Sequence, residues 1–240
     1  AMALLFLKHS PEIELVGITT TLGNGTIATT TRNALYLVER FGIDVPVAQG
    51  PATPLVGPAG DPPHYVHGHN AIGDIELPET IARTVDPRPA HRLIIDLIRE
   101  NPGEIAIVAV GRMTNLALAL REAPEIAGLV KQVVIMGGAF GFHGNHGNVT
   151  PAAEANIAGD PLAADEVAGG SWPVTWVGLD VTHVGTFTDD EFALVDERRT
   201  PAAAYMAEPL AFYRRFGGTF CEPGECPQHD LLAVMAAVVP

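Results

Sequence analysis

Apolar runs that predict strands alternate along the chain with segments that have the apolar spacing of helices. Runs without polar alternation indicate strands covered on both faces, and apolar residues three and four positions apart indicate helices that pack on them. The predicted strands span residues 13–19, 45–48, 105–110, 132–136 and 174–177, and the predicted helices span 26–41, 89–100 and 115–122. This alternation predicts an α/β fold with an open, mostly parallel central sheet, right-handed crossovers and helices on both faces.

The remaining segments are predicted to form a long loop and a helical C-terminal part. Residues 51–87 are rich in proline, glycine and histidine and show no period, and a long loop in a compact domain is usually a lid or a binding loop. Helices are predicted at 188–195, 201–216 and 229–239. With 240 residues, 47% of them hydrophobic, the chain can bury one sizeable core, so we expect a single domain over residues 1–240.

The charge balance and the cysteine content narrow the classes of partner and compartment. A formal net charge of −14 at pH 7 argues against nucleic acid or an anionic membrane as the main partner, since both require a basic face. No apolar run reaches the length of a transmembrane helix. Cys221 and Cys226 are too few for a secreted disulfide scaffold, so we expect reduced thiols and a cytoplasmic protein, although their spacing leaves a short disulfide loop open.

Polar side chains follow several predicted strands at the point where each strand ends. Asn148, Glu154 and Asn156 lie in the loop after strand 132–136, at the edge of the sheet where open α/β folds bind ligands. Carboxamides donate and accept hydrogen bonds and a carboxylate accepts them, so a polyhydroxylated ligand such as a sugar fits this loop. The same residue types are also ordinary in a polar surface loop. Asn24 and Thr114 follow two other strands, so one sheet edge can hold all five residues around one ligand.

Several common catalytic and cofactor patterns do not occur in the sequence. There is no dinucleotide-binding glycine pattern, no phosphate-binding loop and no nucleophile elbow of a serine hydrolase. Histidines crowd two loops, but their spacing fits no standard zinc pattern, and glycine-rich histidine loops are more often simply solvated. These histidines are His64, His67, His69, His143 and His146.

The loop at 148–156, Asn-Val-Thr-Pro-Ala-Ala-Glu-Ala-Asn, resembles the signature of the inosine-uridine-preferring nucleoside hydrolases. Further matches follow in the order of that family at residues 19–24, 31–34, 67–68, 111–117, 136–139 and 229–230. The resemblance spans the whole chain. It implies the Rossmann-like sheet of the nucleoside hydrolases and hydrolysis of the N-glycosidic bond of ribonucleosides to ribose and free base.

The resemblance also implies a metal site and a proton donor. Asp230 and the main-chain carbonyl of Thr114 are implied ligands of Ca²⁺, which would orient a water molecule and lower its pKa. Without the resemblance, Asp230 is equally well explained as a carboxylate in the first turn of a helix, where it complements the helix dipole. His229 is implied to face the nucleobase and to protonate it as it leaves, the alternative being a surface or capping histidine.

The remaining implied site residues bind the substrate. Asn148, Glu154 and Asn156 are implied to hold the ribose hydroxyls, with Asn156 counted beside His229 as catalytic because it holds the ring in reactive geometry. The other implied contacts are Asn24, His67 and Tyr213, the last of which could instead face the core. Trp172 and Trp176 look structural and not base-stacking, which favours an inosine/uridine or pyrimidine preference.

The ends of the chain bear on whether it can act alone. In the resembled family an aspartate-rich loop, which supplies calcium ligands and the general base, directly precedes the helix matched at Ala1. We therefore expect a domain truncated at both ends and inactive by itself. The complete protein is expected to be a homo-oligomeric enzyme, a dimer or tetramer, in purine and pyrimidine salvage. Two alternatives remain: a non-catalytic nucleoside- or ribose-binding protein, and another sugar-processing enzyme on a similar sheet.

Overall fold

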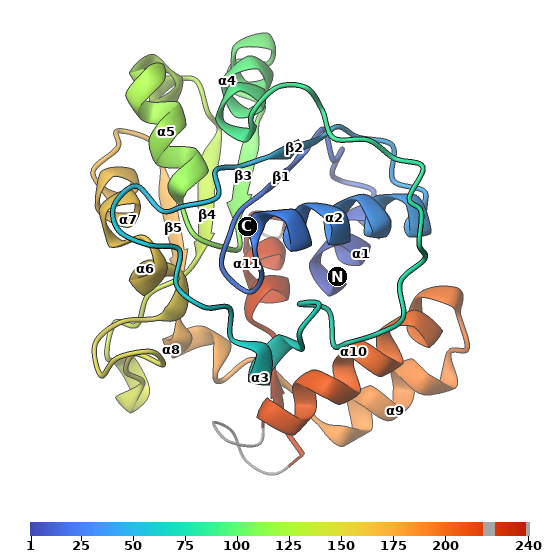
Figure 1. Ribbon diagram of the computed structural model, residues 1–240. Coiled ribbons are helices and arrows are strands. Elements are labelled where there is room, and N and C mark those ends of the chain that lie inside the picture. Colours follow the sequence, from blue (N-terminus) through green and yellow to red (C-terminus); the bar gives the residue numbers. More distant parts are fainter. Residues whose placement is uncertain (218–223, 239–240) are drawn as a thin grey trace.

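Parallel strands form the centre of the computed structural model, which describes residues 1–217 and 224–238 (Figure 1). Strands β3 (Ala106–Ala109), β4 (Gln132–Met136) and β5 (Val174–Val177) form a parallel sheet in the order β3-β4-β5. Strands β1 (Ile18–Thr20) and β2 (Val47–Gln49) form a second parallel pair. The predicted single sheet is thus divided in the described residues, and β1 begins later than predicted.

Helices connect and cover these strands. The longer helices are α1 (Met2–His9), α2 (Ile27–Phe41), α4 (Ala90–Glu100), α5 (Thr114–Glu122), α7 (Pro161–Ala168), α9 (Asp189–Glu197), α10 (Pro201–Gly217) and α11 (His229–Val238). The shorter elements are α3 (His64–His67), α6 (Ala155–Gly159), α8 (Leu179–Thr182), two 3-10 turns at Pro124–Gly128 and Phe142–Gly144, and an antiparallel pair of β6 (Thr186–Phe187) and β7 (Cys226–Pro227). No helix in the described part of the chain is long and apolar enough to cross a membrane.

Strand β4 shows why the central sheet needs helices on both faces. Val133 and Ile135 point into the cluster formed with α4, α5 and α7, whereas Val134 and Met136 point into a second cluster that includes Ala233 of α11. Successive side chains of a strand point to opposite faces, so a strand that is apolar at every position must be covered twice. The predicted α/β class with helices on both faces is confirmed.

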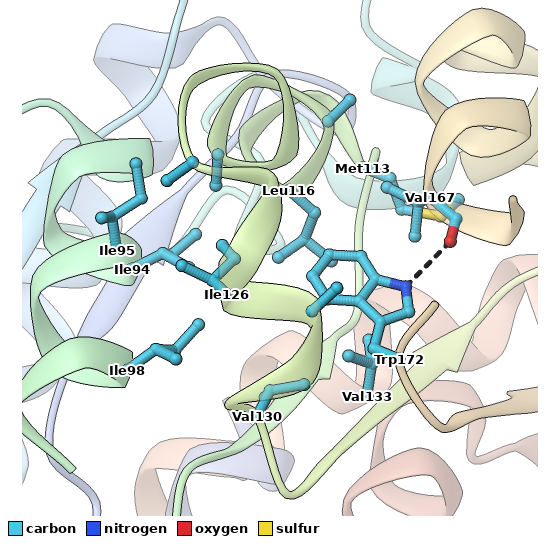
Figure 2. Packing of buried hydrophobic residues seen from close by; sticks show 14 of the residues in the cluster. Ile94, Ile95, Ile98, Met113, Leu116, Ile126, Val130, Val133, Val167 and Trp172 are labelled. Carbon is cyan, nitrogen blue, oxygen red and sulfur yellow. Dashed lines mark hydrogen bonds between the residues drawn. The ribbon is translucent and has the colours of Figure 1, made fainter. Parts of the chain in front are cut away.

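The largest core cluster lies between the sheet and helices α4, α5 and α7 (Figure 2). Trp172 is buried in it, and its indole N–H donates to the carbonyl of Val167 at 2.9 Å, which satisfies the one polar atom of the ring. Trp176 packs against the same cluster. The structural role predicted for both tryptophans is therefore confirmed.

Helix boundaries follow local chemistry that the sequence carries. The Thr26 hydroxyl accepts from the backbone N–H of Thr29 at the start of α2, and Gly42 ends that helix with φ of 60°, a conformation that glycine adopts without strain. At the start of α9, Thr188 and Glu191 form a reciprocal capping box. These signals explain why the predicted boundaries of α2 and α9 lie within two residues of the observed ones.

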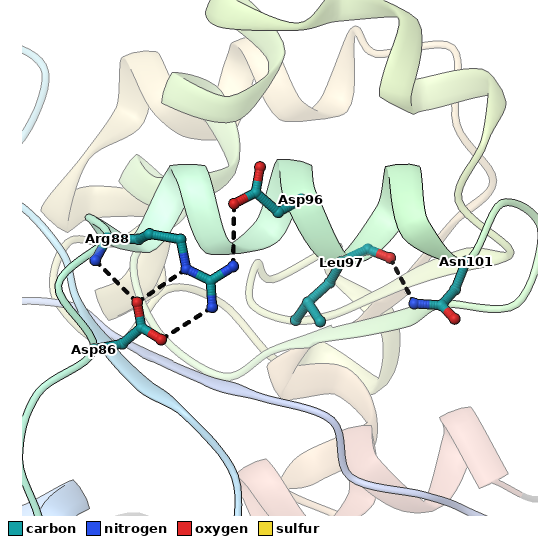
Figure 3. A network of polar contacts seen from close by, with 5 residues as sticks. All are labelled: Asp86, Arg88, Asp96, Leu97 and Asn101. Atoms are coloured by element: carbon teal, nitrogen blue, oxygen red, sulfur yellow. Dashed lines mark hydrogen bonds and ion pairs between the residues drawn. The ribbon is translucent and has the colours of Figure 1, made fainter.

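Two local predictions differ from the structure. Residues 105–110 were expected to form a buried strand, but Ala106 is exposed, because β3 pairs with β4 alone and is an edge strand among the described residues. The long segment 51–87 contains the short helix α3 and returns to the sheet through a bridge between Ala48 and Asp86. There Arg88 binds both Asp86 and Asp96, which ties the end of the segment to α4 (Figure 3).

Candidate active site

A cavity of about 360 Å³ lies between the loop after β4, the helix α3 and the helices α10 and α11. A nucleoside-sized molecule fits a cavity of this volume. The side chains predicted as site residues that line it are Asn24, His67, Asn148, Glu154, Asn156, Tyr213, His229 and Asp230. Residues from five separate stretches of sequence therefore meet at one place.

Glu154 has a structural role that its sequence position does not reveal. It is 2% exposed and caps the N-terminus of α6, where Oε1 accepts from Asn156 N–H at 2.9 Å and Oε2 accepts from Ile157 N–H at 3.1 Å. Oε2 also accepts from the N–H of Gly138 at 3.2 Å, which joins α6 to the end of β4. A carboxylate offers about four acceptor positions, so one remains for a ligand hydroxyl. Burial raises the pKa of Glu154, against the effect of the backbone N–H groups.

The two carboxamides present complementary groups to the cavity. Asn148 Oδ1 accepts from the backbone N–H of Ala155 at 3.0 Å, which leaves its NH₂ group as a donor. Asn156 Nδ2 donates to the carbonyl of Met136 at 3.0 Å, which leaves its oxygen as an acceptor. A backbone N–H can only donate and a backbone carbonyl can only accept, so these partners fix the orientation of both side-chain amides. A donor and an acceptor that line one cavity match the hydroxyl groups of a sugar.

His229 opens helix α11 and lies half-buried in the cavity wall. Its Nδ1 lies 2.7 Å from the hydroxyl of Thr182, a fully buried residue of α8, so Nε2 is the ring nitrogen left for a ligand. Burial, with the nearby rings of His183 and His67, lowers the pKa of His229 to about 4. The imidazole is therefore neutral at pH 7. In that state it can donate from Nε2 only if the Thr182 hydroxyl donates to Nδ1.

The two residues predicted as metal ligands are placed differently. Asp230 lines the cavity, and desolvation by the surrounding cavity wall, with the negative charge of Glu154, raises the pKa of its carboxyl to about 6. Thr114 is 1% exposed, is not among the lining residues, and donates its hydroxyl to Asp160 at 2.6 Å. These oxygens suit a hard cation in kind, but Ca²⁺ takes roughly 6–8 oxygen ligands and this pair supplies fewer. No cluster of three or more acidic, histidine or cysteine side chains suited to a metal occurs in residues 1–217 and 224–238.

An aromatic wall formed by His67, Tyr213, Tyr65 and Phe216 lines the same cavity as the polar loop. His67 of α3 stacks on Tyr213 of α10, with ring centres 5.7 Å apart and planes 10° from parallel, and Tyr65 meets Phe216 edge-on at 5.6 Å. Burial lowers the pKa of His67 to about 4, so this ring is also neutral at pH 7. Tyr213 lines the cavity, and the alternative that it faces the core is wrong.

His183 is a site residue that the sequence analysis missed. It lines the cavity, its ring centre lies 5.6 Å from that of His229, and its Nδ1 lies 3.0 Å from Asn145 Oδ1. It follows strand β5 just as Asn148 follows β4 and Asn24 follows β1. The same rule about strand ends would have found it, had it been applied to β5. The predicted alternatives for Cys221 and Cys226, reduced thiols or a short disulfide loop, involve Cys221, which lies outside the described residues.

Comparison with known proteins agrees with this arrangement. Residues 1–240 match the family model described as inosine-uridine preferring nucleoside hydrolase. The chain is 40% identical over 242 residues to the inosine-uridine preferring nucleoside hydrolase of Crithidia fasciculata, an alignment that covers 100% of this chain and 75% of that protein. The solved structure of a purine-preferring ribonucleoside hydrolase from Gardnerella vaginalis matches 100% of this chain and 76% of its own, with a TM-score of 0.93 and 36% identity.

Plant relatives are similar in sequence but considerably longer. Uridine nucleosidase 1 of Arabidopsis thaliana is 40% identical over 215 residues, which cover 89% of this chain. The chain spans 63% of that protein and 65% of a probable uridine nucleosidase 1 of rice, less than two thirds of either. The family model matches all 240 residues, relatives are about 40% identical, and the fold is shared with solved hydrolases. These findings agree on one family. The chain belongs to the inosine-uridine preferring nucleoside hydrolase family.

Proposed function

We propose that the cavity binds a ribonucleoside and that the complete protein hydrolyses its N-glycosidic bond to ribose and free base. The observation that carries this proposal is that one cavity combines hydrogen-bonding side chains with aromatic rings. Asn148, Glu154 and Asn156 offer a donor and acceptors, and the stacked rings of His67 and Tyr213 add aromatic surface to the same lining. A ribose fits the hydrogen-bonding groups, and a planar base fits the aromatic rings.

His229 is proposed to assist departure of the base. Cleavage of the bond between the anomeric carbon and the base nitrogen leaves negative charge on the base, and a hydrogen bond or proton from Nε2 stabilises it. The pairing of Nδ1 with Thr182 fixes which nitrogen faces the ligand. Because the imidazole is neutral at pH 7, the first effect is a hydrogen bond to the base, and proton transfer requires that the bound base raise the pKa of His229.

We propose Ca²⁺ as the metal, with Asp230 as its carboxylate ligand and the carbonyl of Thr114 as a second. Bound Ca²⁺ would orient the attacking water and lower its pKa. The polar loop lines the same cavity as Asp230, so ribose hydroxyls bound by the loop would add further oxygens. A cytoplasmic homo-oligomer in nucleoside salvage is part of the same proposal, in which the few cysteines support the cytoplasmic location.

A second candidate function is nucleoside or ribose binding without catalysis. One observation favours it: among the described residues that line the cavity, the carboxylates are those of Glu154 and Asp230. Glu154 is held by three backbone N–H groups, and Asp230 is the proposed metal ligand. Neither is left to take a proton from water, so residues 1–240 alone are proposed to bind a nucleoside without hydrolysing it.

One experiment separates these functions. The chain of residues 1–240 and the complete gene product are each mixed with uridine, inosine, cytidine or adenosine, with Ca²⁺ or with excess chelator, and release of reducing sugar is measured. Binding of the same nucleosides is measured by calorimetry. We expect calcium-dependent hydrolysis by the complete product and binding alone by residues 1–240. Binding of no nucleoside by either protein would overturn the proposal, and full activity in chelator would overturn the role of calcium.

A further inference from the structure

A buried asparagine of helix α2 is hydrogen-bonded to the long loop that carries His67. Asn33 is 7% exposed and lies on the apolar face of α2 beside Ala34 and Leu37. A carboxamide in such a position is destabilising unless its polar atoms find partners. Its Nδ2 donates to the backbone carbonyl of Asn70 at 2.8 Å, across 37 residues of sequence.

Asn70 in turn holds the loop in a compact turn. Its side-chain oxygen accepts from the N–H groups of Ile72 and Asp74 at 3.0 and 2.9 Å, and its NH₂ donates to the carbonyl of Ile75 at 2.8 Å. Its own N–H donates to the carboxylate of Asp74 at 3.0 Å. Asn70 therefore makes four hydrogen bonds within this turn, and Asn33 connects the turn to helix α2.

The turn needs this support because its backbone is strained. Ala71 and Asp74 have φ values of 59° and 57°, in the left-handed region that residues with a Cβ rarely occupy. Gly68 and Gly73 also have positive φ, and a Cβ on Gly73 would lie 2.9 Å from the backbone of Pro209 in α10. A turn of this kind persists only where surrounding contacts hold it in place.

The turn is directly joined to the residue that forms the cavity wall. The N–H of Gly73 donates to the carbonyl of His67 at 2.8 Å, and the ring of His67 stacks on Tyr213. We propose that Asn33 is a positioning residue: through Asn70 it holds the 68–75 turn and thereby keeps His67 against Tyr213 in the cavity wall. The contribution of this contact to ligand binding rests on the proposed function, whereas its effect on the turn does not.

Two substitutions test the contact without ligand. Asn33→Asp keeps the size of the side chain but cannot donate to the Asn70 carbonyl at neutral pH, and Asn33→Leu removes all hydrogen bonding. Asn101→Leu is the matched control, because Asn101 Nδ2 also donates to one carbonyl, that of Leu97 at 3.1 Å, away from the cavity (Figure 3). Hydrogen–deuterium exchange of residues 1–240 is followed by mass spectrometry, and the His67 ring is titrated by NMR.

Both Asn33 variants should speed exchange in residues 68–75 by about five- to tenfold, the factor that one lost hydrogen bond corresponds to, while α5 and α7 exchange as before. The pKa of His67 should rise from about 4 toward 6.5 as its ring meets solvent. Unchanged exchange in 68–75, an equal rise across the molecule, or the same effect from Asn101→Leu would each overturn the proposal.

A calorimetric titration with uridine separates this inference from the proposed function. Weaker uridine binding by both Asn33 variants, with unchanged binding by Asn101→Leu, would support a role of the turn in the site. If the unsubstituted chain and the complete product bind no nucleoside, the proposed function fails, and the exchange measurement still decides whether Asn33 holds the turn. If nucleoside binds the Asn33 variants normally although the turn exchanges faster, the positioning role is overturned.

Discussion

Glu154 combines a ligand-facing carboxylate with a structural cap, and its replacement by alanine should therefore destabilise the fold as well as weaken binding. The sequence alone predicts only contact with ribose for this residue. In the structure, three backbone N–H groups, those of Gly138, Asn156 and Ile157, donate to it in a site that is almost closed to water. Removing the acceptor leaves donors without partners at the junction of β4 and α6.

The size of the effect follows from these contacts. Loss of an N-cap costs about 1 kcal/mol, and a hydrogen bond to a charged group is worth about 1.5–3 kcal/mol. The contributions are not additive, because burial of the carboxylate already opposes them, as its raised pKa indicates. We expect Glu154→Ala to lower the free energy of unfolding by about 2–4 kcal/mol, and Glu154→Gln, which keeps one acceptor oxygen, to lower it by less.

Urea unfolding followed by circular dichroism measures this loss, with Asp165→Ala as the control. Asp165 is an exposed carboxylate of α7, so its removal should change stability by no more than about 0.5 kcal/mol. A second measurement, the Kd for uridine under conditions in which Glu154→Gln is folded, reports the fourth acceptor position of the carboxylate. We expect about tenfold weaker binding for the loss of one charged contact. Equal stability of Glu154→Ala and Asp165→Ala would refute the capping argument.

Three further changes probe the scaffold. Trp172→Ala should lower the free energy of unfolding by about 3–5 kcal/mol, because it empties part of the main core; a loss below about 1 kcal/mol in urea unfolding would contradict this. Gly42→Ala should cost about 1 kcal/mol because φ is 60° there, whereas Gly128→Ala, with no atom within 4 Å of the new methyl, should be tolerated; equal effects would argue against strain. Burial alone would raise the pKa of Asp180, but backbone N–H donors hold this pKa below its ordinary value of 3.8. The charged Asp180 carboxylate therefore stabilises the fold above pH 3.8, so Asp180→Asn should be less stable than the unsubstituted chain there. The difference in free energy of unfolding should shrink as pH falls below 3.8. A constant difference across that range would contradict the assignment.

The fold was predictable from sequence wherever a local signal and the tertiary structure agree. Strands β4 and β5 and helices α2, α4 and α5 lie where periodicity placed them, within one residue at each boundary. The short helices α6 and α8 were not predicted, because elements of five and four residues are too short to show a period. Contacts at the ends of strands fix them instead. The exposure of β3 depends on which strands pair with it, which periodicity does not encode.

The site was predictable to a different degree, since the rule about strand ends gives positions and not roles. It brought Asn24, Asn148, Glu154 and Asn156 to one cavity, and it would have added His183 if it had been applied to β5. It gave no indication that Thr114 bonds to Asp160 away from the lining, or that Glu154 caps a helix. Which atom of a polar side chain remains free depends on its hydrogen bonds, and these form only when the segments meet.

The polar side chains of the loop after β4 contribute both to stability and to ligand binding. Each side chain, of Glu154, Asn148 and Asn156, makes hydrogen bonds to the backbone and keeps at least one polar group that faces the cavity. Side chains anchored in this way are held in place before a ligand arrives, so less conformational entropy is lost on binding. The same anchoring couples the loop after β4 to the fold. Substitutions in this loop should therefore alter binding and stability together.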